Sequence, residues 1–110
     1  MPRLYSWNVN GFRAILKKGF VEWLEAEQPD VLCLQEVKAE PGQLPPVALE
    51  PKGYRSVWQP AKKKGYSGLA TFYKTRHAPV EVSTLGIAEF DDEGRAQLLD
   101  YGAYVLINTY

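Results

Sequence analysis

The order of apolar and polar positions predicts a β-α-β unit in the first 36 residues. Residues 3–9 are rich in β-branched and aromatic side chains and are typical of a strand, which Asn10-Gly11 ends. An apolar stripe at helical spacing follows, made of Leu16, Phe20, Trp23 and Leu24. This spacing predicts one principal helix. Residues 31–34 are continuously apolar, as in a strand covered on both faces, and the two strands should be parallel.

The rest of the chain predicts further strands. Residues 40–53 hold four of the eight prolines and are expected to form a loop with one helical turn around residues 47–49. Strands are predicted over residues 54–59, 68–74, 79–83, 96–100 and 103–110. Alternation over residues 68–74 predicts a half-buried strand. Residues 96–100 and 103–110 should form an antiparallel hairpin. The predicted fold class is therefore α/β, with a mixed sheet and one principal helix.

Length and composition restrict the class of protein. A chain of 110 residues allows one domain, and 45% hydrophobic residues are enough for a core. No apolar run approaches the roughly 20 residues of a membrane helix, and no secretory signal is visible, so no membrane association is expected. The single cysteine, Cys33, is interpreted as a buried core thiol, which suits a reducing compartment. We expect a cytoplasmic protein, associated with the nucleoid if the source is bacterial.

The formal net charge of zero conceals a strong pattern. Residues 1–21 and 51–80 contain bases and no acids, whereas residues 22–50 and 81–110 are predominantly acidic. Because local potential governs contact with phosphates, a polyanionic partner is compatible with the balanced total. The alternative is that Lys62–Lys64 is a solvated surface loop, and charge alone favours that simpler interpretation.

Polar side chains follow the two strands of the predicted β-α-β unit. Asn8 and Asn10 come at the end of the first strand, and Glu36 comes directly after the second. Parallel strands bring their carboxyl ends to one sheet edge, where oxygen ligands suit a hard cation such as Mg²⁺. The alternatives are a surface ion pair between Glu36 and Lys38, and ordinary turn chemistry for the two asparagines.

Three segments resemble the exonuclease III/apurinic (AP) endonuclease family of the endonuclease/exonuclease/phosphatase superfamily, in order and in spacing. They are Ser6–Ala14, Pro29–Lys38 and Gly65–Gly68. The resemblance covers essentially the whole chain but only the amino-terminal part of the family's catalytic domain. It implies that residues 1–110 are an incomplete portion of a four-layer α/β/β/α sandwich. We expect them to supply about one layer pair, with the inner sheet face exposed, and the chain stops inside its last predicted strand.

The resemblance also implies roles for individual residues. Glu36 would bind the catalytic Mg²⁺ or Mn²⁺, and Asn10 would lie beside the metal. Asn8 would orient neighbouring groups, and Tyr110 would act as a catalytic tyrosine at the scissile phosphate. The expected DNA contacts are Arg13, Lys18, Lys64, Gly65 and Tyr66.

The implied activity is metal-dependent hydrolysis of phosphodiesters at abasic sites in double-stranded DNA, with related 3′–5′ exonuclease and 3′-phosphatase activities. The family's Gly-Asp-x-Asn and Ser-Asp-His motifs follow the tyrosine and are not in this sequence. We therefore expect the 110 residues alone to be inactive, and the missing carboxy-terminal half to be a partner. The alternatives are a non-catalytic module that binds DNA or a partner, and another phosphodiesterase or phosphatase of the superfamily.

Overall fold

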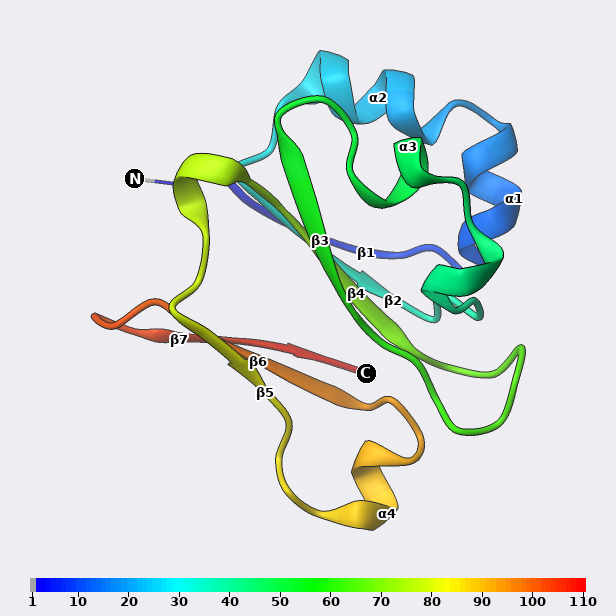
Figure 1. Ribbon diagram of the computed structural model, residues 1–110, viewed down its shortest axis with the longest axis vertical. Coiled ribbons are helices and arrows are strands. Elements are labelled where there is room, and N and C mark those ends of the chain that lie inside the picture. The colour runs from blue at the N-terminus through cyan, green and yellow to red at the C-terminus, as the bar shows by residue number, and fades with distance from the viewer. Residues whose placement is uncertain (1) are drawn as a thin grey trace.

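Two β-sheets lie face to face in the computed structural model, which describes residues 2–110 (Figure 1). The first sheet has the strand order β1-β2-β4-β3, with bounds β1 (Leu4–Asn8), β2 (Val31–Gln35), β4 (Leu69–Lys74) and β3 (Tyr54–Gln59). The second sheet has the order β5-β6-β7, with bounds β5 (Glu81–Ser83), β6 (Ala96–Asp100) and β7 (Val105–Thr109). Strands β1 and β2 are parallel and the other pairs are antiparallel. The predicted α/β class and mixed sheet are therefore confirmed.

The predicted principal helix is two helices. The helices of the chain are α1 (Phe12–Lys17), α2 (Phe20–Glu27), α3 (Pro46–Leu49) and α4 (Ala88–Asp91), with 3₁₀ turns at η1 (Pro41–Gln43) and η2 (Thr75–His77). The break falls at Gly19, whose φ of 102° is accessible to a residue without a Cβ. The apolar stripe stays continuous because Leu16 of α1 and Leu24 of α2 pack into the same core.

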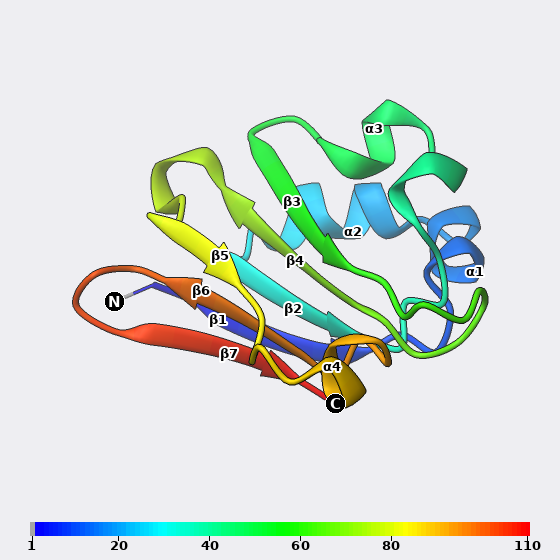
Figure 2. The same ribbon diagram turned by 60° about the horizontal axis from the view of Figure 1, so that its bottom comes forward.

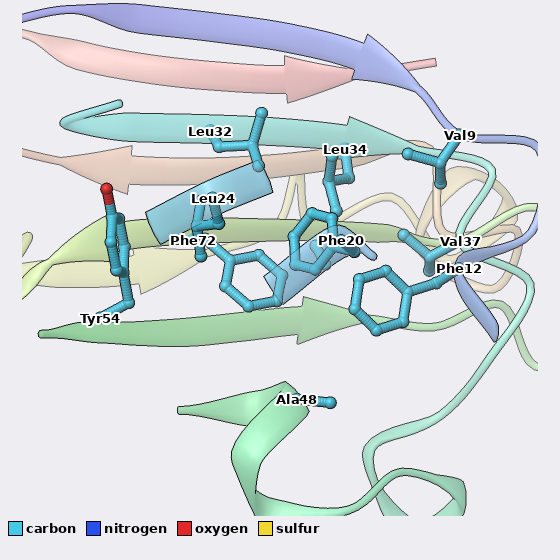
Figure 3. Packing of buried hydrophobic residues seen from close by; sticks show 11 residues of the cluster. Val9, Phe12, Phe20, Leu24, Leu32, Leu34, Val37, Ala48, Tyr54 and Phe72 are labelled. Atoms are coloured by element: carbon cyan, nitrogen blue, oxygen red, sulfur yellow. The ribbon is translucent and has the colours of Figure 1, made fainter. Parts of the chain in front are cut away.

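The main core lies between the helices and the first sheet (Figure 3). Leu32 and Leu34 of β2 and Phe72 of β4 have no exposed surface, and Phe12 and Phe20 cover them from the helices. The Phe12–Phe20 and Phe20–Phe72 rings meet edge to face, with centroids 4.9 and 5.3 Å apart. This geometry adds to the free energy of burying the rings, so the helical layer is held firmly on the sheet.

The second sheet covers the opposite face of the first (Figure 2). Buried polar side chains join the two: the Asn108 amide donates to the Leu34 and Ala70 carbonyls at 3.2 and 3.1 Å. The Thr71 hydroxyl donates to Gln97 at 2.7 Å. The expectation of one layer pair with an exposed inner face is therefore wrong, because residues 81–109 form a third layer. For the same reason β4 is buried on both faces rather than half-buried.

Cys33 lies between the two sheets and is 7% exposed. Burial raises the pKa of its thiol to about 11, so the thiol is protonated at neutral pH. The interpretation of Cys33 as a core thiol is confirmed. Across residues 2–110, no helix is long and apolar enough to span a membrane.

Candidate active site

The carboxyl ends of β1 and β2 meet at one edge of the first sheet. Asn8 is paired with Gln35 in the parallel register. Backbone hydrogen bonds continue this pairing beyond the strands, from Gly11 N–H to the Glu36 carbonyl at 2.7 Å and from Phe12 N–H to the Val37 carbonyl at 2.8 Å. The polar residues that follow the two strands are therefore held side by side, as the parallel arrangement requires.

Three of the candidate residues form one hydrogen-bonded group with Lys38. The Asn8 amide nitrogen donates to Glu36 Oε1 at 2.9 Å, and its oxygen accepts from the Asn10 backbone N–H at 3.1 Å. The Lys38 ammonium donates to Asn10 Oδ1 at 2.7 Å and lies 3.8 Å from Glu36 Oε2. Asn8 thus orients the carboxylate, and the suggested pairing of Glu36 with Lys38 is present in the same group.

The surroundings of Glu36 keep its carboxylate charged. Hydrogen bonds from Asn8, and then from the Tyr110 hydroxyl, hold the pKa of Glu36 below its ordinary value, and the charges of Lys38 and Arg95 lower it further. The same hydrogen bond raises the pKa of the Tyr110 phenol. At neutral pH this edge therefore presents an ionised carboxylate next to a protonated phenol.

The backbone at this edge takes an uncommon conformation. Asn10, Glu36, Lys38 and Ser67 all have a positive φ, between 47° and 53°. Such residues cost on the order of 1–3 kcal/mol each and persist where the surrounding structure fixes them. Here the Lys38 N–H donates to the Ser67 carbonyl at 2.9 Å, which ties the end of β2 to the loop between β3 and β4. Four of the five non-glycine residues with a positive φ in the described residues therefore lie at this edge and in the loop hydrogen-bonded to it.

The donor atoms at the edge suit a hard divalent cation. Glu36 Oε2 and Asn10 Oδ1 both face the Lys38 ammonium, so a positive charge already lies between the two oxygens. Carboxylate and amide oxygens are the ligands that Mg²⁺ and related cations take, with water and substrate completing the shell. In the described residues, 2–110, no group of three or more His, Cys, Asp or Glu could hold a metal. The Glu36 and Asn10 oxygens are therefore the candidate ligands at this edge, and water or substrate would have to supply the rest of the shell.

The predicted DNA contacts divide into two groups. Arg13 is exposed on the first turn of α1, directly after the site, but Lys18 lies at the other end of that helix beside Trp7 and Trp23. The second group comprises Lys64, Gly65 and Tyr66, exposed in the loop between β3 and β4. The structure therefore places Arg13 at the end of α1 that adjoins the strand edge and Lys18 at its opposite end.

Two residues near the site were missed by reasoning from the sequence. The Arg95 guanidinium lies 5.1 Å from the centroid of the Tyr110 ring, and it donates to the Tyr66 hydroxyl at 2.9 Å. Glu93 accepts from Arg95 at 2.9 Å and from Tyr66 at 3.0 Å. The one available signal was that Arg95 is the only Lys or Arg in the acidic block of residues 81–110.

The sequence is similar to those of known nucleases. The model of the Endonuclease/Exonuclease/phosphatase family matches residues 5–109. A DNA-(apurinic or apyrimidinic site) endonuclease of Dictyostelium discoideum and an exodeoxyribonuclease of Bacillus subtilis are each 41% identical over 98% of this chain. The chain spans only 29% and 42% of their respective lengths.

Solved structures of related enzymes have the same fold as this chain. An AP endonuclease from Archaeoglobus fulgidus superposes with a TM-score of 0.79 at 32% identity, over 100% of this chain and 41% of that one. A Neisseria 3′ phosphatase bound to a product DNA hairpin superposes with a TM-score of 0.77 at 30% identity, again over 100% and 41%. The matched residues include nearly all of both sheets and the edge that carries Glu36, so the chain belongs to the Endonuclease/Exonuclease/phosphatase family.

Proposed function

We propose that this chain is the amino-terminal part of a divalent-metal-dependent DNA-repair nuclease that hydrolyses phosphodiesters at abasic sites in double-stranded DNA. The observation that carries the proposal is the ionised Glu36 carboxylate, which accepts a hydrogen bond from Asn8 at the strand edge and, like the Asn10 amide oxygen, faces the Lys38 ammonium. The names of the relatives support the substrate class. Such a protein would act in the cytoplasm, at the nucleoid in a bacterium.

Glu36 and Asn10 would hold the metal, which we propose to be Mg²⁺, with Mn²⁺ as a substitute. When bound, the metal neutralises the charge that develops on the reacting phosphate. Asn8 fixes the orientation of the carboxylate by donating to Oε1, and Oε2 faces the Lys38 ammonium 3.8 Å away. Glu36 therefore supplies the negative charge for the metal, and Asn8 fixes the orientation of the Glu36 carboxylate.

Tyr110 is proposed to contact the scissile phosphate. The residue is 47% exposed, so a substrate could reach it from solvent. The hydrogen bond with Glu36 raises the pKa of the phenol, which favours the protonated hydroxyl further. The single O–H of Tyr110 would turn from Glu36 to a phosphate oxygen when substrate binds, which would stabilise negative charge without a proton transfer.

The basic groups on either side of the site are proposed to hold the DNA backbone. Arg13 and Lys18 would act on one side and the exposed Lys64–Tyr66 segment on the other, through phosphate contacts that position the duplex without reading its sequence. Binding through such contacts releases counterions, so affinity should fall steeply as salt rises.

We further propose that the site is completed by a carboxy-terminal polypeptide. Within residues 2–110, β1 pairs only with β2 and β7 pairs only with β6, so each sheet has an open edge here. A groove of about 250 Å³ runs between these edges, lined in part by Leu4, Cys33 and Leu106. Open strand edges beside an apolar groove favour pairing with further strands. The fraction of each relative that the chain spans supports the same proposal.

Cleavage of a duplex that contains one abasic site tests the function. The 110-residue chain, in Mg²⁺, should give no cleavage above background, because groups that act as a unit lose most of the rate when members are missing. The same chain joined to the carboxy-terminal remainder of the Bacillus subtilis exodeoxyribonuclease should nick the duplex at the abasic site.

The outcomes separate the alternatives. Cleavage by the 110 residues alone would overturn the proposed inactivity. A joined protein that hydrolyses other phosphodiesters but not abasic DNA would support another phosphatase of the superfamily. A joined protein that is folded and binds DNA but hydrolyses nothing would support a non-catalytic binding module.

A further inference from the structure

Arg95 lies between two residues that belong to separate parts of the proposed site. Its guanidinium donates to the Tyr66 hydroxyl at 2.9 Å, and lies 5.9 Å from the centroid of the Tyr66 ring and 5.1 Å from that of Tyr110. Both distances are within the range of a cation–π contact. A salt bridge to Glu93 at 2.9 Å orients the planar fork. A single side chain therefore contacts the DNA-binding loop and the site tyrosine together.

The backbone carbonyl of Arg95 is hydrogen-bonded to the end of β7. Its carbonyl accepts from the Tyr110 N–H at 2.9 Å and from the Thr109 hydroxyl at 2.9 Å. These bonds place the Tyr110 ring next to the Arg95 side chain, so movement of Arg95 reaches Tyr110 through the backbone as well as through the ring contact.

The segment that carries Arg95 is packed closely against the loop that carries Tyr66. Gly94 has a φ of 61°, and a Cβ there would meet the Gln59 carbonyl oxygen at 2.8 Å and the Ala61 nitrogen at 2.9 Å. The Lys62 N–H donates to the Asp92 carbonyl at 2.7 Å. Only glycine permits this approach, which fixes Arg95 relative to the start of the Tyr66 loop.

We propose that Arg95 is a positioning residue that couples the Tyr66 loop to Tyr110, so that contact of the loop with a DNA backbone changes the placement of the site tyrosine. The part of the proposal that concerns DNA rests on the proposed function, whereas the coupling itself does not. Lysine is a poor substitute, because it retains the charge but lacks the planar fork that contacts Tyr66 and Glu93 together.

A double-mutant comparison in the free chain tests the coupling. Tyr110 is replaced by 3-fluorotyrosine, and its ¹⁹F signal is recorded with and without Tyr66→Phe, which removes the hydroxyl that Arg95 contacts. In the chain that keeps Arg95, Tyr66→Phe should shift the ¹⁹F signal of Tyr110. In the Arg95→Met and Arg95→Lys backgrounds Tyr66→Phe should leave it unchanged within error. Arg76→Met is the matched control, since Arg76 is exposed and pairs with Asp30.

The result distinguishes a coupling role from a purely structural one. A shift of equal size in the Arg95, Arg95→Met and Arg76→Met backgrounds would overturn the proposal, as would no shift in any background. Circular dichroism confirms that each variant is folded, and a variant that fails is replaced by Arg95→Gln.

A second arm adds an abasic duplex. In the unsubstituted chain the Tyr110 signal should change with the same midpoint as DNA binding, and Arg95→Met should abolish that change while binding persists. Failure to bind DNA at all would count against the proposed function, but the comparison in the free chain would still decide the coupling.

Discussion

Replacing Glu36 with glutamine in the joined protein is expected to lower the rate of abasic-site cleavage by at least about 10²-fold, since loss of residues that merely support a metal ligand already costs 10–100-fold. The substitution preserves the shape of the side chain but removes the charge that faces Asn10 and Lys38. It also replaces one of the two carboxylate oxygens by a donor, which disturbs the hydrogen bonding with Asn8. The measurement is the single-turnover rate of nicking in Mg²⁺.

Glu50→Gln is the matched control, because Glu50 is an exposed acid on the helical side of the chain, after α3. Its rate should equal that of the unsubstituted protein. If Glu36→Gln retained the full rate while its melting temperature stayed unchanged, Glu36 would not be a metal ligand and the proposed site would be wrong.

Phe72→Ala is expected to destabilise the chain by about 3–5 kcal/mol, the usual cost of removing a fully buried phenylalanine. Phe72 has no exposed surface, and its ring contacts those of Phe12, Phe20 and Trp58. Its removal leaves a cavity at the centre of the contact between the helices and the first sheet. Because domains of this size are stabilised by only about 5–15 kcal/mol, much of the free energy of unfolding would be lost.

Urea unfolding, followed by tryptophan fluorescence, measures this effect. Phe90→Ala makes the same chemical change at a side chain that is 47% exposed on α4. Phe90→Ala should lower the urea midpoint of unfolding far less than Phe72→Ala does. Equal shifts for the two variants would mean that Phe72 is not the centre of the core that the structure shows.

The elements nearest the site could be predicted because their signals are local. The parallel strands at Leu4–Asn8 and Val31–Gln35 each form from one short segment, the first rich in aromatic residues and the second apolar, and the first and last positions of β3 match the expected range of residues 54–59. Once two strands are parallel, Asn8 and Glu36 must lie at one edge, so the hydrogen bond between them follows from the topology.

The second sheet could not be predicted in its place, because its inner face breaks the usual pattern. Gln97 and Asn108 are 1% exposed, yet they are polar, and they face the first sheet through hydrogen bonds rather than apolar contact. An alternation of polar and apolar residues normally assigns polar residues to solvent. In this sheet Gln97 and Asn108 are buried instead, so alternation does not reveal which face of the second sheet packs on the first.

Arg95 was missed for a related reason. Its partner Tyr66 is 29 residues away, and the contact depends on the close approach at Gly94. Composition singles out Arg95 as the only base in its block, but it does not show that Arg95 reaches Tyr66. The break at Gly19 is likewise a matter of backbone angle, since the apolar stripe continues across it.

The proposed function depends on a divalent cation held by Glu36, and Mn²⁺ mapping by NMR tests this most directly. Added to the ¹⁵N-labelled 110-residue chain, Mn²⁺ should broaden the backbone amide signals of Asn10, Glu36 and Lys38 first. Glu36→Gln should abolish the effect, whereas Lys38→Met should strengthen it, since the Lys38 ammonium competes for the same oxygens. Broadening centred on the acidic segment Asp91–Glu93, or broadening at Glu36 that survives Glu36→Gln, would contradict the proposed metal site.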